Sequence, residues 1–251
     1  MEKIAFIADI HSNIVALEAV LKDIENRNIH RIFCLGDLVL KGSSPCEVVD
    51  IIKEKCEVVV KGNCDNSAVY PNSPHKQWYQ NKLGKERLSY LDSLPLYHDL
   101  YMSGSFIRMF HATKQDFSNR IFDIDSIERK MTLFEDENGQ IPDIVLYADI
   151  HKQYMQKLQN KTIINIGSVG NVLEFPNYDE TITNMQETMQ AYYCIIEGEY
   201  ASKEKAPLSI QFIRVPYDIQ KEIELAKRNE TPDIIPYIEE LTTAKYRKLK
   251  K

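Results

Sequence analysis

The sequence predicts an α/β fold built around a mostly parallel β-sheet. Short apolar runs alternate with amphipathic segments over the first 65 residues, which is the pattern of βαβ units. The chain has 251 residues, a length that suits one α/β domain with insertions. Because 43% of its residues are hydrophobic, it can bury a sizeable core and is not expected to be disordered.

The amino-terminal quarter of the chain alternates strand and helix. Residues 3–8 form a short apolar run that predicts a strand, and residues 14–25 place their apolar side chains on one helical face. Apolar runs at 31–35 and 57–60 predict the next two strands, and residues 48–52 fall in a helix between them. This order of elements predicts the parallel part of the sheet.

A helical insertion is expected next, over residues 66–104. Prolines punctuate this segment, and within it residues 76–94 carry Trp78 and several leucines at mixed helical spacing. Later strands are expected at 106–110, 144–147, 162–166, 191–196 and 209–215, helices at 124–134, 218–228 and 232–249, and an acidic turn at 136–142. The chain, 1–251, is therefore predicted to be a single domain that ends in a helical tail, 218–251.

Composition and charge exclude several classes of protein. Lys and Arg number 31 against 37 Asp and Glu, giving a net charge of −6, so stable nucleic-acid binding is not expected and the basic cluster at 245–251 is interpreted as a solvated tail. No stretch approaches the ~20 apolar residues of a membrane span, so no membrane association is expected. Five cysteines without a C-x-x-C motif argue against a disulfide framework and a structural zinc, and favour a reducing, cytoplasmic location.

Polar side chains that can bind metals follow five of the expected strands. In chain order they are Asp9 and His11, then Asp37, Asn63, His111, and finally Asp149 and His151. In α/β sheets, functional sites collect beyond the carboxyl ends of strands. One such residue alone would be a polar strand end or a helix cap, but five elements in order, each after an apolar run, predict a shared site. Carboxylate, amide and imidazole ligands suit manganese, iron or zinc.

The other histidines and cysteines are expected to have ordinary roles. His30, His75 and His98 lie in polar or inserted segments, where a histidine needs no function to explain it. Four of the cysteines are interpreted as small core residues, namely Cys34, Cys46, Cys56 and Cys194.

The strand-end motifs resemble the signature of the calcineurin-like metallophosphoesterases, and in particular the bacterial single-domain phosphoesterases that open with D-I-H-x-N. The segments that carry the resemblance are residues 9–13, 35–39, 60–65, 165–170 and 214–218. The resemblance covers residues 1 to about 220. It implies a four-layer α/β/β/α sandwich with a di-metal centre at the edge of the sheets.

The same resemblance implies a role for each strand-end residue. One metal would be held by Asp9, His11, Asp37 and His151, and the other by Asp37, Asn63, His111 and Asp149. Asp37 would therefore bridge two ions, expected to be Mn and/or Fe, and the catalytic residues are expected to be Asp37, Asn63 and His111. Two such ions polarise a phosphoryl oxygen and generate hydroxide near neutral pH, which would attack phosphorus in line with the leaving oxygen.

Two positions depart from the family pattern. Asp149 stands where the family usually has a histidine. It can still ligate, but its negative charge would lower the Lewis acidity of the centre and favour a harder ion such as ferric iron; alternatively it points away and the second metal binds weakly. Cys64 stands where many relatives carry a histidine that assists the leaving group. A thiol is a poor acid for this task, so leaving groups that need no protonation, such as a nucleotide phosphate, are favoured.

Four side chains are candidate contacts for the substrate phosphate: Asn13, Lys41, Asn66 and Arg120. Asn13 is the strongest of them, because the start of a helix favours an anion. Four aromatic residues of the insertion could stack on a base or simply pack, namely Tyr70, Trp78, Tyr79 and Tyr90.

The function expected from these residues is that of a di-metal phosphohydrolase. Its partner would be a small phosphorylated substrate, a phosphodiester or phosphoanhydride such as a nucleoside or dinucleoside polyphosphate. Two alternatives stay open: a phosphoprotein phosphatase, and a non-catalytic scaffold that retains a relic metal site.

Overall fold

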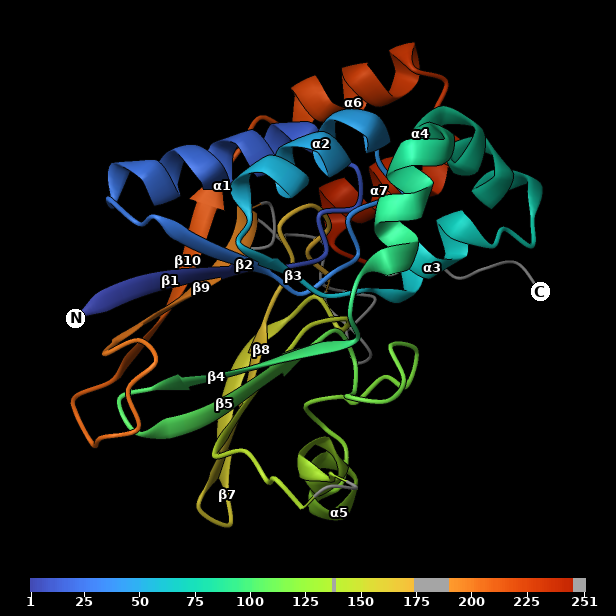
Figure 1. Ribbon diagram of the computed structural model, residues 1–251. Coiled ribbons are helices and arrows are strands. Elements are labelled where there is room, and N and C mark those ends of the chain that lie inside the picture. The colour runs from blue at the N-terminus through green and yellow to red at the C-terminus, as the bar shows by residue number, and fades with distance from the viewer. Residues whose placement is uncertain (137–138, 174–189, 246–251) are drawn as a thin grey trace.

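The computed structural model describes residues 1–136, 139–173 and 190–245 as two stacked sheets with helices on both outer sides (Figure 1). The elements in chain order are β1 (Glu2–Ile7), α1 (Ile14–Asn26), β2 (Arg31–Cys34), α2 (Pro45–Lys55), β3 (Val58–Val59), α3 (Asn63–Val69), α4 (Pro74–Ser93), β4 (Tyr97–Met102), β5 (Ser105–Phe110), α5 (Ile127–Met131), the 3₁₀ helix η1 (Thr132–Phe134), β6 (Ile144–Tyr147), β7 (Gln153–Leu158), β8 (Lys161–Ile166), β9 (Gln190–Gly198), β10 (Ser209–Pro216), α6 (Ile219–Arg228) and α7 (Ile234–Thr243).

The first sheet contains the βαβ units that the sequence predicts. Its strand order is β10-β9-β1-β2-β3, in which β1, β2 and β3 run parallel. The strand β9 pairs antiparallel with β1, with Ile4 of β1 opposite Ile196 of β9, and β10 pairs antiparallel with β9 at the edge of the sheet. Strands from both ends of the chain therefore share one sheet.

The second sheet, with the order β4-β5-β6-β8-β7, contains two strands that the sequence pattern did not predict. Its centre is parallel, and β4 and β7 pair antiparallel at its edges. The β4 strand lies in the segment 66–104 that was expected to be helical; the helices of that insertion end at Ser93. The side chains of the β7 strand are half-buried or exposed, and none is fully buried. Both strands are defined by pairing with a hairpin partner, which an apolar pattern does not report.

Apolar side chains fill the spaces between the layers. Phe6 and Phe33 of the first sheet pack against Met109 and Ile164 of the second. The helices α1, α2 and α6 cover the outer face of the first sheet, and α5 with η1 covers part of the second, where Phe134 packs on Val145 (Figure 1). These layers confirm the predicted α/β/β/α sandwich.

The remaining expectations differ in detail from the structure. The helix expected over 124–134 is the short α5 followed by η1, and the helix expected over 232–249 is α7, which ends at Thr243. Residues 137–138 of the expected acidic turn and 246–251 of the basic cluster lie outside the described residues. All five cysteines are free thiols. None of the helices in the described ranges combines the length and the apolar character that crossing a bilayer requires.

A buried carboxyl group connects the α6–α7 pair to the loop before α2. Glu222 of α6 is fully buried, and its Oε1 accepts hydrogen bonds from the backbone N–H of Ser43 (3.2 Å) and the hydroxyl of Tyr237 (3.1 Å). Its Oε2 has no hydrogen-bond partner among the described residues. Burial raises the pKa of Glu222 to about 7, although the hydrogen bonds from Ser43 and Tyr237 oppose the shift.

We expect Glu222→Gln to remove a pH dependence of stability. The folded protein keeps the Glu222 proton up to about pH 7, whereas the unfolded chain loses it near pH 4.5. Wild-type stability therefore falls, relative to the variant, as pH rises through this window, by up to about 3 kcal/mol. Thermal unfolding of the metal-free proteins between pH 4.5 and 8 measures the difference. The exposed Glu224→Gln serves as control, and a Tm difference between Glu222→Gln and wild type that does not change with pH would contradict the assignment.

Candidate metal centre

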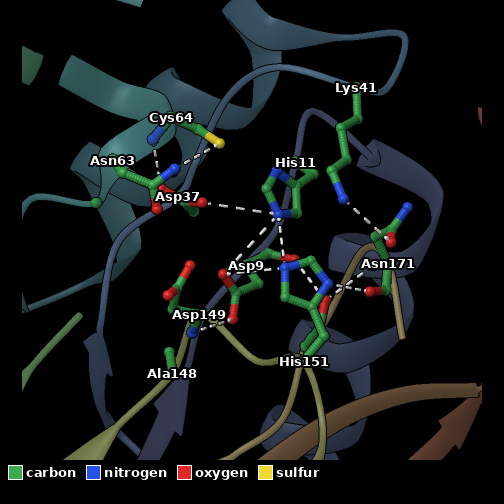
Figure 2. A network of polar contacts seen from close by, with 12 residues as sticks. Asp9, His11, Asp37, Lys41, Asn63, Cys64, Ala148, Asp149, His151 and Asn171 are labelled. Carbon is green, nitrogen blue, oxygen red and sulfur yellow. Dashed lines mark hydrogen bonds and ion pairs between the residues drawn. The ribbon is translucent and has the colours of Figure 1, made fainter. Parts of the chain in front are cut away.

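The strand-end side chains converge from both sheets on one site. Figure 2 shows how Asp9, His11, Asp37, Asn63, Asp149 and His151 gather there. They follow the carboxyl ends of four strands and the start of α3: Asp9 and His11 follow β1, Asp37 follows β2, Asn63 begins α3, His111 follows β5, and Asp149 and His151 follow β6. All except the half-buried Asn63 are buried. The structure therefore brings together all seven residues that the sequence predicts as metal ligands.

Five of these seven residues have left-handed backbone conformations. The φ angles are 51° at Asp9, 49° at His11, 54° at Asp37, 67° at Asp149 and 59° at His151. Non-glycine residues seldom adopt positive φ, and such strain persists where the surroundings enforce it. Here the N–H groups of Asp9 and His11 donate to the carbonyls of Gly36 and Asp37, both at 3.0 Å. The strand-end loops thus hold one another in the conformation that turns the side chains inward.

The loops after β2 and β3 are in direct backbone contact. A Cβ on Gly62 would lie 2.1 Å from Oδ1 of Asp37, so only glycine fits there. Asp65, the last residue of the G-N-x-D motif, accepts hydrogen bonds from the backbone N–H groups of Asp37 (2.9 Å), Leu38 (2.8 Å) and Gly62 (3.0 Å). Asp65 therefore holds Asp37 in place without facing the centre itself.

Two histidines face each other on one side of the centre. Nε2 of His11 lies 3.1 Å from Nε2 of His151, while Nδ1 of each ring faces a backbone carbonyl, that of Val39 or Asn171. A ring nitrogen that meets a carbonyl oxygen carries the proton, so the two Nε2 atoms present lone pairs to each other. Burial lowers the pKa of both rings, that of His151 to about 3, so both are neutral.

Asp9 completes this donor set. Its Oδ1 is buried, has no hydrogen-bond partner among the described residues, and lies 3.5 Å from Nε2 of His151 and 3.8 Å from Nε2 of His11. Unpaired buried carboxylate oxygens are costly. Two facing lone pairs and an unpaired carboxylate oxygen fit a cation bound among them, so the residues present suit the metal that the resemblance implies.

A second donor set surrounds His111. Its Nδ1 donates to the carbonyl of Leu35 at 2.8 Å, which leaves Nε2 toward Oδ1 of Asp37 (3.4 Å), Oδ1 of Asp149 (3.7 Å) and the amide of Asn63 (3.1 Å). Burial alone would lower the pKa of His111, but the Asp37 and Asp149 carboxylates raise it well above its ordinary value. These negative charges converge on one point, as around a bound cation.

Asp37 lies between the two donor sets. Its Oδ2 is 3.8 Å from Nε2 of His11, and its Oδ1 is 3.4 Å from Nε2 of His111. Burial alone would raise the pKa of Asp37, but His111, His11 and the side chain of Cys64 lower it. The backbone N–H of Cys64 also donates to Oδ1 at 2.8 Å. One carboxylate with an oxygen toward each set has the placement that bridging of two ions requires.

Asp149 is paired with an arginine, which the sequence did not predict. Nε of Arg120 donates to Oδ2 of Asp149 at 2.9 Å, and Nη2 donates to Oδ1 at 2.7 Å. Burial alone would raise the pKa of Asp149, but hydrogen bonds with His111 and Arg120 lower it to about 2. The extra negative charge expected from the sequence is therefore matched by a guanidinium. The structure gives no reason to expect a harder ion.

The donor sets open into a small cavity of about 100 Å³. Five of the seven predicted metal ligands line it, together with Lys41, Cys64, Arg120, Ile150 and Leu173. Nζ of Lys41 donates to Oδ1 of Asn171 at 3.4 Å and lies 3.5 Å from Oε2 of the buried Glu240 in α7. Two of the four predicted phosphate contacts, Lys41 and Arg120, thus reach the cavity.

The other two predicted phosphate contacts lie elsewhere. Asn13 is buried as the N-cap of α1, where its Oδ1 accepts from the N–H of Ala16 at 3.0 Å and its Nδ2 donates to the carbonyl of Gly170 and the hydroxyl of Tyr217. Its amide is already hydrogen-bonded on both sides. Asn66 lies in α3, away from the cavity lining.

None of the four aromatic residues singled out in the insertion lines the cavity. Tyr79 is buried and donates to the carbonyl of Gly42, and Trp78 packs on the core between the first sheet and its helices. Base stacking on them therefore has no geometric support. His75 pairs with Asp233 at 2.7 Å and His98 contacts the Phe33 ring, so both lie outside the centre, as expected. A wider hollow of about 960 Å³ lies at the amino ends of β1 and β2, where no predicted ligand reaches.

Two polar residues behind the cavity were missed from the sequence. Asn171 accepts from His151 through its carbonyl, and its amide donates to Oε2 of Glu240 at 3.0 Å. Asn171 directly follows the Gly-Ser-Val-Gly segment at 167–170, in which a Cβ on Gly170 would lie 1.8 Å from the carbonyl oxygen of Ile10. This glycine-containing segment is the local sequence signal that could have indicated Asn171. Glu240 lies in a helix and has no such signal beside it.

Comparisons with known proteins agree with this arrangement. A family model described as the calcineurin-like phosphoesterase superfamily domain matches residues 2–187. An uncharacterized protein of Methanocaldococcus jannaschii is 30% identical over 92% of this chain and 94% of its own.

Two solved structures have a similar fold. A hypothetical protein from Pyrococcus horikoshii is 21% identical, with a TM-score of 0.76 over 98% of this chain and all of its own. A metallophosphoesterase from Sphaerobacter thermophilus is also 21% identical, with a TM-score of 0.73 over 97% of this chain and 99% of its own. At this identity, these two structures support the fold alone.

Proposed function

The chain belongs to the calcineurin-like phosphoesterase superfamily and is a metal-dependent phosphoesterase, and we propose that it hydrolyses small phosphodiesters or phosphoanhydrides at a centre of two metal ions. The observation that carries the proposal is Asp37, whose two carboxylate oxygens face two separate donor sets. One ion would be held by Asp9, His11, Asp37 and His151, and the other by Asp37, Asn63, His111 and Asp149. Such ions, when bound, polarise phosphoryl oxygens and make water a nucleophile near neutral pH.

The chemistry of the donors favours manganese or iron. Three imidazoles, those of His11, His111 and His151, belong to the two donor sets. Imidazole suits borderline divalent ions, whereas magnesium prefers oxygen ligands and keeps several waters. We therefore propose Mn and/or Fe as the bound ions.

The cavity favours recognition of the phosphoryl group itself. Its volume of about 100 Å³ is well below the roughly 300 Å³ at which typical ligand pockets begin, so the rest of the substrate would stay outside. Lys41 and Arg120 line it as cations and would contact phosphoryl oxygens. Ile150 and Leu173 line it as apolar side chains and would limit the access of water.

The thiol of Cys64 supports a preference for stable leaving groups. Cys64 lines the cavity, and burial raises the pKa of its thiol well above the ordinary value. Such a thiol donates a proton poorly, so leaving groups that need no protonation are favoured. Nucleoside and dinucleoside polyphosphates release such a group, and we propose them as the substrate class. The five free cysteines support a reducing, cytoplasmic location as part of the same proposal.

Chelation followed by metal replacement tests the nature of the centre. We expect a chelator to abolish hydrolysis of bis(p-nitrophenyl) phosphate, and Mn²⁺ to restore it at least about tenfold better than Mg²⁺, because imidazoles bind the borderline ion. Initial rates at matched free-metal concentrations measure the effect. Equal or better rescue by Mg²⁺ would contradict the assignment of three imidazole ligands.

A substrate panel tests the proposed class against its two alternatives. With Mn²⁺ bound, we expect kcat/KM for nucleoside and dinucleoside polyphosphates to exceed that for a phosphopeptide by at least about tenfold. A preference for the phosphopeptide would favour a phosphoprotein phosphatase. Absence of hydrolysis of every substrate by protein that holds two Mn²⁺ would favour a scaffold with a relic metal site.

A further inference from the structure

The ion pair between Arg120 and Asp149 connects two loops that border the metal centre. Arg120 lies in the segment after β5, and Asp149 follows β6. The two hydrogen bonds, 2.9 Å from Nε and 2.7 Å from Nη2, engage both carboxylate oxygens at once. The Asp149 side chain is 3% exposed and that of Arg120 is 31% exposed, so the pair is largely shielded from solvent on the carboxylate side. Bidentate pairs of this kind fix orientation as well as charge.

The main chain around Arg120 is itself anchored. The next residue, Ile121, is fully buried, and its carbonyl accepts a hydrogen bond from the hydroxyl of Tyr147 at 2.9 Å. The carbonyl of Arg120 accepts from Nη2 of Arg129 at 3.1 Å. Arg120 is therefore presented to Asp149 from a fixed segment of the chain.

Asp149 shares one oxygen between the arginine and the metal centre. Its Oδ1, which accepts a hydrogen bond from Nη2 of Arg120 at 2.7 Å, also lies 3.7 Å from Nε2 of His111. Its backbone N–H donates to Oδ2 of Asp9 at 3.2 Å. A carboxylate oxygen has two lone-pair directions, so Oδ1 can accept from the guanidinium and still face a cation beside His111.

The pair also balances the charge of the centre. Asp9, Asp37 and Asp149 carry three negative charges, one more than the same centre would have with a neutral imidazole at position 149. The guanidinium of Arg120 is always protonated and cancels that excess. Together, the aspartate and the arginine supply an oxygen donor with no net charge, which is the electrostatic equivalent of a histidine.

We propose that Arg120 is a positioning residue that orients Asp149 as a ligand of the second metal and cancels its charge, so that the two residues replace one histidine as a unit. The proposal rests on the two-metal centre of the proposed function. It predicts that the affinity of the second metal site depends on the residue at position 120.

The test measures metal binding rather than turnover. Wild type, Arg120→Gln, Arg120→Lys, Asp149→His and the double variant Arg120→Gln/Asp149→His are stripped of metal and titrated with Mn²⁺, with stoichiometry checked by elemental analysis. Arg87→Gln is the matched control, because Arg87 forms the same bidentate pair with Asp50 on the surface, at 2.8 and 2.6 Å. Circular dichroism and metal-free Tm values confirm that each variant folds.

We expect Arg120→Gln to weaken the second Mn²⁺ site by about 10- to 100-fold and to leave the first site unchanged. Arg120→Lys keeps the positive charge but lacks the planar guanidinium that makes two hydrogen bonds at once. Its affinity for the second Mn²⁺ is therefore expected to lie between those of wild type and Arg120→Gln. Asp149→His alone leaves the guanidinium facing an imidazole, so it also weakens the second site. The double variant is expected to recover to within about threefold of wild type, because the two changes are coupled.

Two kinds of result would overturn the proposal, and they are distinguishable. If wild type binds two Mn²⁺ and Arg120→Gln binds both with unchanged affinity, or if the effects in the double variant simply add, Arg120 does not act through Asp149 and only this inference fails. If wild type binds one Mn²⁺ or none, the two-metal centre of the proposed function fails as well.

Discussion

Replacement of Asp37 with asparagine is expected to lower kcat for phosphodiester hydrolysis by at least about a thousandfold, or ~4 kcal/mol, without unfolding the protein. Asp37 presents a different carboxylate oxygen to each donor set, Oδ2 at 3.8 Å from Nε2 of His11 and Oδ1 at 3.4 Å from Nε2 of His111. An amide has one oxygen and no charge, so it can serve one ion at most. Loss of the bridge therefore removes the two-ion arrangement on which the proposed activity depends.

The asparagine variant keeps the contacts that hold the loop. Its Oδ1 can still accept from the N–H of Cys64, as the carboxylate does at 2.8 Å, and the backbone N–H of residue 37 can still donate to Asp65. Steady-state kinetics at saturating Mn²⁺, with metal-free Tm as the measure of folding, check the prediction. Asp50→Asn on the surface of α2 is the matched control. More than about a tenth of wild-type kcat in Asp37→Asn would contradict a bridging role.

The candidate ligands could be predicted from sequence because each one directly follows an apolar strand. Strand periodicity places Asp9, Asp37 and His111 at carboxyl strand ends, and the packing of two sheets brings those ends together. The prediction needed only local patterns and the order of the elements. The left-handed backbone at Asp9 and Asp37, which turns these side chains inward, has no counterpart in the sequence pattern.

The partners of those ligands could not be predicted, because they come from distant segments of the chain. Arg120 lies 29 residues before Asp149, and Glu240 lies 69 residues after Asn171. Their pairing depends on where the loop after β5 and the helix α7 settle, which no local pattern reports. Asn13 was expected to contact the substrate phosphate, and here a local contact, rather than a distant one, explains the difference. A helix start can bind an anion, but here the side chain itself caps the helix and is fully engaged.

Replacement of Asp9 with asparagine is expected to stabilise the metal-free protein and to destroy tight metal binding. Oδ1 of Asp9 is buried without a hydrogen-bond partner among the described residues, and burial and the nearby carboxylates of Asp37 and Asp149 raise its pKa well above the ordinary value. In wild type without metal, this carboxyl group therefore opposes folding. An amide removes the charge and keeps one oxygen to accept from the N–H of Asp149, as Oδ2 does at 3.2 Å.

The new amide N–H₂ would meet acceptors that the carboxylate cannot satisfy. Nε2 of His151 and Nε2 of His11 lie 3.5 and 3.8 Å from Oδ1 of Asp9, and both present lone pairs. A hydrogen bond to either ring, together with the lost buried charge, should stabilise the metal-free variant by about 1 to 3 kcal/mol. In a chain of this length, that raises Tm by a few degrees.

Metal should reverse the order of stability. Wild type gains stability from each ion that binds the folded state, whereas Asp9→Asn lacks a charged ligand and gains little. Thermal unfolding of both proteins should therefore give a higher Tm for the variant in chelator and a higher Tm for wild type in saturating Mn²⁺. Asp50→Asn, far from the centre, should follow wild type in both conditions. A variant less stable than wild type in chelator would mean that Asp9 has a structural partner, and that its unpaired oxygen is not held in place for a cation.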